Sequence, residues 1–176
     1  VSNLNSQKKF SNRKIDNLKN QVQQLVEEDK KMTQVMIDKV FSFGELGFQE
    51  FETSKYLSKI LEENGFDIEY QISGIPTSWL ATWSNGEGGP TIALGSDFDG
   101  VPSTSQYPGV AYEKPVVEGA PGHGEGHNIG LPIVITSAIS IKKIMIENNI
   151  SGTLVLWPGV AEEILGAKAW YVRDLS

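Results

Sequence analysis

The stretch LPIVITSAISIKKIMIENNISGTLVLW, residues 131–157, decides the fold class of this chain. Its first part, residues 131–146, has the dense apolar pattern of a buried helix, and residues 153–157 form an apolar, strand-like run after Gly152. Another short apolar run, residues 91–94, lies upstream. A strand, a helix and a second strand joined by crossovers of this size predict an α/β sheet.

Further predicted elements flank this core. They comprise helices over residues 11–43 and 53–64, strands over residues 66–72 and 79–83, and a final helical piece that stops at Ser176. The first helical stripe predicts one long helix or two abutting helices. Thr53 is the expected cap of the next helix, and the turn residues 85–90 are expected to join a hairpin-like pair of strands.

Length and charge limit the classes of protein to consider. With 176 residues the chain has room for one ordinary domain. We expect a polar helical extension over residues 1–31 and an α/β domain over residues 32–176. The formal charge of −7 argues against nucleic acid or an anionic membrane surface as a partner. No apolar run is expected to span a membrane.

The chain contains no cysteine, so any metal would have only nitrogen and oxygen ligands. The first residues, VSNLNSQKKF, lack the apolar core of a signal peptide, which favours the cytoplasm. The missing initiator Met is compatible with a removed export signal. The sequence therefore leaves the compartment undetermined.

The only two histidines, His123 and His127, lie in GHGEGHN, residues 122–128, with Glu125 midway between them. In an extended backbone alternate side chains point the same way, so these three would face one ion. Imidazole and carboxylate groups are common ligands of transition metals, and the glycine spacers let the backbone bring them together. The alternative is a flexible polar loop with clustered histidines, but the spacing favours a metal site.

Two acidic pairs, Asp97/Asp99 and Glu162/Glu163, each follow a predicted strand. Ligands of α/β sheets bind beyond the carboxyl ends of strands, and so many negative charges gathered there would require a cation. Taken alone, the aspartates could be turn residues and the glutamates a helix start. Together with the histidines they predict metal-assisted hydrolysis, in which one glutamate binds the ion and the other moves protons.

Five segments, in this order, resemble the peptidase family M20 metallohydrolases, which are aminoacylase and carboxypeptidase-like enzymes. The similarity is greatest to the amidohydrolase branch that includes the aminobenzoyl-glutamate hydrolases. The segments are FGELGFQEFETS (43–54), GIPTSW (74–79), SDFDGVP (96–102), GHGEGHN (122–128) and PGVAEE (158–163). The resemblance covers about Met32 to the end. It implies a three-layer α/β/α zinc-exopeptidase-like catalytic domain that is truncated before the lid domain.

The resemblance also implies roles for individual residues. Glu162 would be the general base, and Asp99, the second catalytic candidate, would orient His127. The metal ligands would be Glu125, His127 and Glu163. Glu125 stands where the family has a cysteine or a bridging aspartate, and a carboxylate there can still bridge two ions.

The remaining candidates, His123 and Asp97, are expected to support the ligands from behind rather than bind metal. The implied cofactor is one or two divalent ions, with zinc first and manganese or cobalt as alternatives. The implied function is metal-dependent hydrolysis of an amide bond in an N-acyl amino acid or small peptide-like substrate. A homo-oligomer or a second chain could complete the domain. The alternative is a non-catalytic binding or interaction protein that keeps the fold without a complete metal site.

Overall fold

A computed structural model describes residues 10–175. Its centre is a mixed four-stranded sheet in the order β1-β2-β4-β3. The strands are β1 (Asp67–Tyr70), β2 (Trp79–Asn85), β3 (Thr91–Asp97) and β4 (Gly152–Gly159). The α-helices are α1 (Asn12–Glu28), α2 (Lys30–Phe43), α3 (Phe51–Glu63), α4 (His127–Glu147) and α5 (Ala167–Leu175). Two single 3-10 turns, η1 (Ile72–Gly74) and η2 (Glu162–Ile164), complete the list of helical elements.

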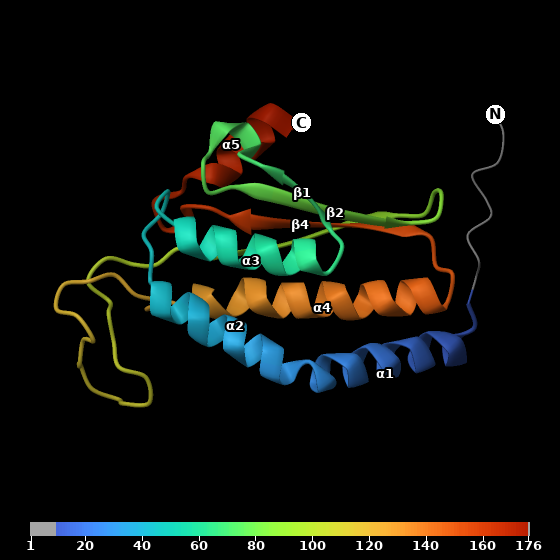
Figure 1. The fold of residues 1–176 in the computed structure, drawn as a ribbon, viewed down its shortest axis with the longest axis horizontal. Coiled ribbons are helices and arrows are strands. Elements are labelled where there is room, and N and C mark those ends of the chain that lie inside the picture. The colour runs from blue at the N-terminus through green and yellow to red at the C-terminus, as the bar shows by residue number, and fades with distance from the viewer. Residues whose placement is uncertain (1–9, 176) are drawn as a thin grey trace.

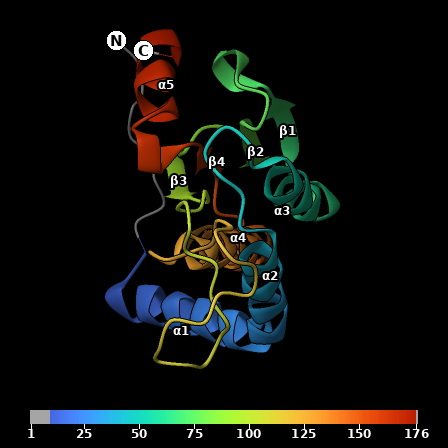
Figure 2. The same cartoon turned by 90° about the vertical axis from the view of Figure 1, so that its left-hand side faces the viewer.

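Helices lie on both faces of the sheet (Figures 1 and 2). One face is covered by α3 and α4, and α1 and α2 pack against α4 on its outer side. The opposite face carries α5, where the Tyr171 ring meets the Trp157 ring of β4 edge to face. The predicted α/β class with helices on both faces is confirmed.

The β3–α4–β4 unit sets the position of everything else. β3 and β4 pair in parallel, in a register that places Asp97 opposite Gly159. Leu154 and Leu156 of β4 and Leu131 and Ile135 of α4 belong to one buried core cluster. Because the two parallel strands end at the same edge, the residues that follow them must lie close together.

The prediction that the turn at residues 85–90 joins a hairpin-like pair of strands is wrong. β2 and β3 flank this turn, but β4 lies between them and pairs with both, antiparallel to β2 and parallel to β3. Buried and half-buried side chains alternate along most of β4, and Leu154 and Leu156 are among the buried ones. The strand takes a central position because its apolar side chains need cover from both neighbours. The antiparallel pair joined along the chain is β1–β2.

The start of α3 differs from the sequence prediction. Thr53 does not cap this helix, because the helix begins at Phe51. The Glu45 carboxylate instead accepts hydrogen bonds from the backbone N–H groups of Glu52 (3.0 Å) and Thr53 (2.9 Å). A carboxylate at this end satisfies free N–H donors and complements the helix dipole.

The N-terminal stripe forms two abutting helices, α1 and α2, that meet at Asp29. The first nine residues of the predicted extension lie outside the described residues. Within the described part, Leu18 and Val22 of α1 help to line an apolar cavity of about 300 Å³ beside α4 and β3.

α4 is long and apolar enough to cross a membrane by length and composition, with a mean hydropathy of 1.7 over its most apolar window. The expectation that no run reaches this threshold is therefore wrong. In the structure half of that window is buried, between the sheet and the N-terminal helices. A core helix enclosed on two sides is apolar for the same reason as a membrane helix.

Candidate metal centre

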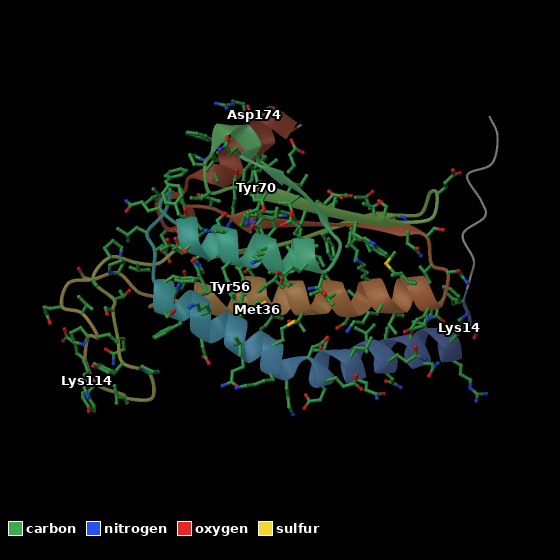
Figure 3. All side chains as sticks on the ribbon, in the orientation of Figure 1. Lys14, Met36, Tyr56, Tyr70, Lys114 and Asp174 are labelled. Carbon is green, nitrogen blue, oxygen red and sulfur yellow. The ribbon has the colours of Figure 1, made fainter. Side chains whose placement is uncertain are left out.

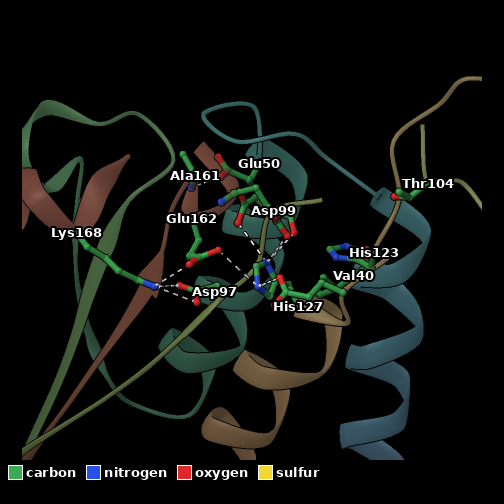
Figure 4. Close-up of polar contacts among 12 residues, drawn as sticks. Val40, Glu50, Asp97, Asp99, Thr104, His123, His127, Ala161, Glu162 and Lys168 are labelled. Carbon is green, nitrogen blue, oxygen red and sulfur yellow. Dashed lines mark hydrogen bonds and ion pairs between the residues drawn. The ribbon is translucent and has the colours of Figure 1, made fainter. Parts of the chain in front are cut away.

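The carboxyl edge of the sheet gathers side chains from three elements (Figure 4). Asp99 follows β3, and Glu162 and Glu163 form the start of η2 just after β4. His127 is the first residue of α4, and Glu125 precedes it in the loop. The left-handed backbone of Gly126 (φ 100°), which an L side chain would disfavour, turns the chain between these two side chains.

His127 is the centre of the cluster. Its Nδ1 lies 3.1 Å from the backbone carbonyl of Asp99, which can only accept, so Nδ1 carries a proton and Nε2 presents its lone pair. Nε2 lies 2.8 Å from Oε2 of Glu125 and 4.0 Å from Oε2 of Glu162. A proton or a cation must therefore stand between the imidazole and the Glu125 carboxylate.

Asp99 connects the histidine to the acidic turn. Its carboxylate is buried, with Oδ1 3.4 Å from Nδ1 of His127. Its Oδ2 accepts a hydrogen bond of 3.0 Å from the backbone N–H of Glu163. Asp99 thus contacts both the imidazole and the segment that carries the two glutamates.

Four of these side chains could share an ion. Glu125, His127, Glu162 and Glu163 each offer one ligand atom, and the four atoms lie within 4.8 Å of one another. Ligands about 2.1 Å from one ion are at most about 4.2 Å apart, so only a small closure of the cluster is needed.

The buried Oε1 of Glu163 has no hydrogen-bond partner. Burial raises the pKa of Glu163, and the adjacent Glu125 carboxylate adds to the rise. A divalent cation among these carboxylates would offset their repulsion, so the donor set fits such an ion.

Asp97 lies apart from this cluster. Its carboxylate pairs with the ammonium of Lys168 on α5, at 2.8 Å through Oδ1 and 3.0 Å through Oδ2. Gly159 leaves the space for it, because a Cβ at that position would lie 1.7 Å from Oδ1 of Asp97. The same ammonium lies 3.8 Å from Oε1 of Glu162, so Lys168 links Asp97 to the edge of the site.

His123 is not brought into the cluster. It is buried, and its Nε2 lies 3.1 Å from the backbone carbonyl of Val40 in α2. Burial lowers the pKa of its imidazole. The side chain therefore ties the glycine-rich loop to α2, which is compatible with the expected supporting position behind the ligands.

Three residues that the sequence does not single out lie beside the site in the structure: Glu50, Thr77 and Lys168. Glu50 is fully buried and contacts both Thr77 and the turn before Glu162. Both Glu50 and Thr77 lie in segments that resemble the M20 family, which was the available signal. Lys168, in the helix after Glu163, had no comparable signal, because an isolated lysine is normally solvent-exposed.

Comparison with solved structures places the fold among aminohydrolases and peptidases. A protein from methicillin-resistant Staphylococcus aureus, described as an aminohydrolase, matches with a TM-score of 0.72 and 21% identity, over 89% of this chain and 39% of that chain. The YXEP protein of Bacillus subtilis, described as a dinuclear metal binding peptidase from the M20 family, matches with a TM-score of 0.68 and 24% identity, over 84% and 40%.

Sequence comparison points to the same group. The chain is 30% identical over 149 residues to one of the subunits of p-aminobenzoyl-glutamate hydrolase from Escherichia coli strain K12, which covers 85% of this chain and 31% of the relative. It is 31% identical over 131 residues to the amidohydrolase-type protein YhaA of Bacillus subtilis strain 168, over 69% of this chain and 29% of the relative. No protein-family model matches the chain.

These similarities define the chain as an α/β protein with the fold of named aminohydrolases and peptidases. More specifically, it is homologous to part of the M20 amidohydrolases and peptidases, and the resemblance seen in its sequence is confirmed. The chain spans 31% and 29% of the length of the two curated relatives described above.

Proposed function

We propose that the protein is a metal-dependent amidohydrolase that cleaves an amide bond in an N-acyl amino acid or a small peptide-like substrate. The observation that carries this proposal is the joining of His127 to a set of carboxylates at the sheet edge, one of which has a buried oxygen without a partner. Homology to named hydrolases supports the same reaction class.

Glu125, His127 and Glu163 would hold the ion, or two ions bridged by Glu125. Zinc is the first candidate because imidazole and carboxylate suit it, and manganese or cobalt are the alternatives. When bound, a divalent ion supplies a Lewis acid that makes water nucleophilic near neutral pH and polarises the amide carbonyl.

Glu162 would be the general base. It lies beside the ligands but is partly exposed, so its carboxylate can accept a proton from the attacking water and deliver it to the leaving nitrogen. Asp99 would hold the His127 ring in place through its carbonyl and its carboxylate. Asp97, paired with Lys168, would support the edge of the site without binding the ion.

A small amide or peptide is the proposed substrate, and the proposed assembly is a homo-oligomer or a complex with a second chain. The Escherichia coli relative is named as one of the subunits of its enzyme, which supports an assembly with a partner. The predictions that nucleic acid and an anionic membrane surface are not partners rest on the formal charge alone.

The test is Glu162→Gln in the full-length protein, assayed on a panel of N-acyl amino acids and dipeptides. We expect turnover to fall by about 100-fold or more, because proton transfer contributes roughly 100- to 10,000-fold. Metal content, measured by elemental analysis after dialysis, should stay at the wild-type level. Retained hydrolysis would refute the role of Glu162.

Elemental analysis of the wild-type protein also addresses the non-catalytic alternative. Stoichiometric zinc, manganese or cobalt supports the enzyme, and a metal-free protein without hydrolytic activity supports a binding protein. The named hydrolases among the relatives do not favour that alternative.

A further inference from the structure

Glu50 is a completely buried acid outside the proposed ligand set. It lies just before α3, and both of its carboxylate oxygens have partners. Oε1 accepts a hydrogen bond of 2.8 Å from the backbone N–H of Ala161, and Oε2 accepts one of 2.9 Å from the Thr77 hydroxyl. Figure 4 shows Glu50 and Ala161 together above His127. Three segments far apart in the sequence therefore meet at one carboxylate.

The partner of Glu50 is an unusual residue. Ala161 has a left-handed backbone (φ 53°, ψ 42°), which a residue with a Cβ adopts rarely. This conformation turns the chain from β4 into η2, where Glu162 and Glu163 follow. A strained backbone of this kind persists only where its surroundings over-determine it.

Several contacts hold the Ala161 backbone in this conformation. The residue is buried, and a Cβ at Gly47 would lie 2.9 Å from both Cα and Cβ of Ala161. The loop before α3 is thus packed directly onto the turn, and its Glu50 carboxylate reaches the Ala161 N–H. Two residues further on, the buried Asp99 carboxylate holds the N–H of Glu163.

We infer that Glu50 is a positioning residue that fixes the Ala161 turn and thereby aims Glu162 and Glu163 at the metal centre. The Glu50 carboxylate accepts a hydrogen bond from the backbone N–H of Ala161, and the Asp99 carboxylate accepts one from the backbone N–H of Glu163. These two anchors lie on either side of Glu162. The role of the aimed glutamates rests on the proposed function, but the anchoring of the turn is a separate structural statement.

Packing alone would not require a polar side chain at this place. Burying a carboxylate is costly, and burial raises the pKa of Glu50 despite the donors around it. An apolar residue would fill the same space at lower cost, but it would leave the Ala161 N–H unpaired. The need for an acceptor at Ala161 accounts for a polar side chain at this position.

The experiment compares Glu50→Met with Glu50→Gln in the full-length protein. Methionine has no acceptor for the Ala161 N–H, whereas glutamine keeps a carbonyl oxygen there. We expect Glu50→Met to weaken zinc binding, measured by competition with a chromogenic chelator, by about 10-fold or more, as losses of supporting hydrogen bonds do. Its kcat should fall with little change in KM. Glu50→Gln should stay within about threefold of the wild type in both properties.

Leu61→Ala is the matched control, because Leu61 is equally buried but lies near the C-terminal end of α3, whereas Glu50 precedes its N-terminal end. It should lower Tm and leave zinc affinity unchanged. If Leu61→Ala weakens zinc binding as much as Glu50→Met, or if Glu50→Met binds zinc and turns over like the wild type, the inference is wrong. Should Glu50→Met not fold, Thr77→Val replaces it, with the same direction of effect on zinc affinity and a smaller size expected.

Amide hydrogen exchange at Ala161 separates this inference from the proposed function. The Ala161 amide should be protected in the wild type and in Glu50→Gln, and should exchange at least about 10-fold faster in Glu50→Met, because its buried bond is lost. Faster exchange together with a wild-type protein that binds no zinc would support the anchor and reject the metal site. Equal exchange in all three proteins would reject the anchor.

Discussion

At the scale of single residues, negative charge dominates the site. Asp99, Glu125, Glu162 and Glu163 surround one imidazole, and Lys168 is the fixed cation seen beside them within residues 10–175. The sequence could indicate these acids because each follows a strand or flanks a histidine. It could not indicate that Lys168 pairs with Asp97, since that depends on how α5 lies against the sheet.

The burial of Glu50 is another feature that the sequence pattern could not predict. An acid next to a helix start is normally read as solvent-exposed and favourable to the helix dipole. Here Glu45 caps the helix and Glu50 is buried. Only the long-range contact with Ala161, 111 positions away in the sequence, reveals the difference.

The burial of Glu50 has a consequence for stability. Because burial raises the pKa of this carboxyl above its ordinary 4.5, the folded state holds the proton more tightly than the unfolded state. This stabilisation is fully present below pH 4.5 and is lost as the pH rises through the raised pKa. We expect the free energy of unfolding of the wild type, relative to Glu50→Gln, to decrease between pH 4.5 and neutral pH.

Urea unfolding of both proteins across this range measures the effect, and subtracting the variant removes the titration of all other groups. A wild type that gains stability relative to Glu50→Gln as the pH rises would contradict the direction of the pKa change.

At the scale of helices and strands, local sequence patterns predict the elements that are determined by residues close together in the chain. The apolar pattern of residues 131–157 predicted α4 and β4 and an α/β sheet, and the structure adds that β3 and β4 pair in parallel. The insertion of β4 between β2 and β3 was missed, because strand order depends on which strand buries most surface between its neighbours. Figure 3 shows the side chains that fill the space between the sheet and the helices.

The N-terminal helix offers a test at this scale. Leu18 of α1 lines the apolar cavity beside α4 and β3, whereas its neighbour Lys19 is exposed. We expect Leu18→Asp to lower the free energy of unfolding by about 1–3 kcal/mol, because it places a charge against apolar side chains. Lys19→Asp, on the same helix, should stay within about 0.5 kcal/mol of the wild type.

Chemical denaturation of the three proteins gives these values. Equal stability of the Leu18 and Lys19 variants would mean that α1 is a detachable extension rather than part of the core packing.

At the scale of the whole molecule, the described residues bring one edge of a sheet, one helix start and two loops to a single point. The fold does this through the parallel β3–β4 pair, and the buried carboxylates of Glu50 and Asp99 hold the segment after β4 against it. The chain spans 31% of its Escherichia coli relative, so this arrangement corresponds to one part of that relative's length.

The proposed function requires a divalent ion bound among Glu125, His127 and Glu163. The most direct measurement is a crystal structure of the full-length protein grown with zinc, with anomalous data collected on both sides of the zinc absorption edge. We predict an anomalous peak about 2.0–2.2 Å from Nε2 of His127 and from carboxylate oxygens of Glu125 and Glu163. No peak at this edge of the sheet, or a peak bound by other side chains, would contradict the account.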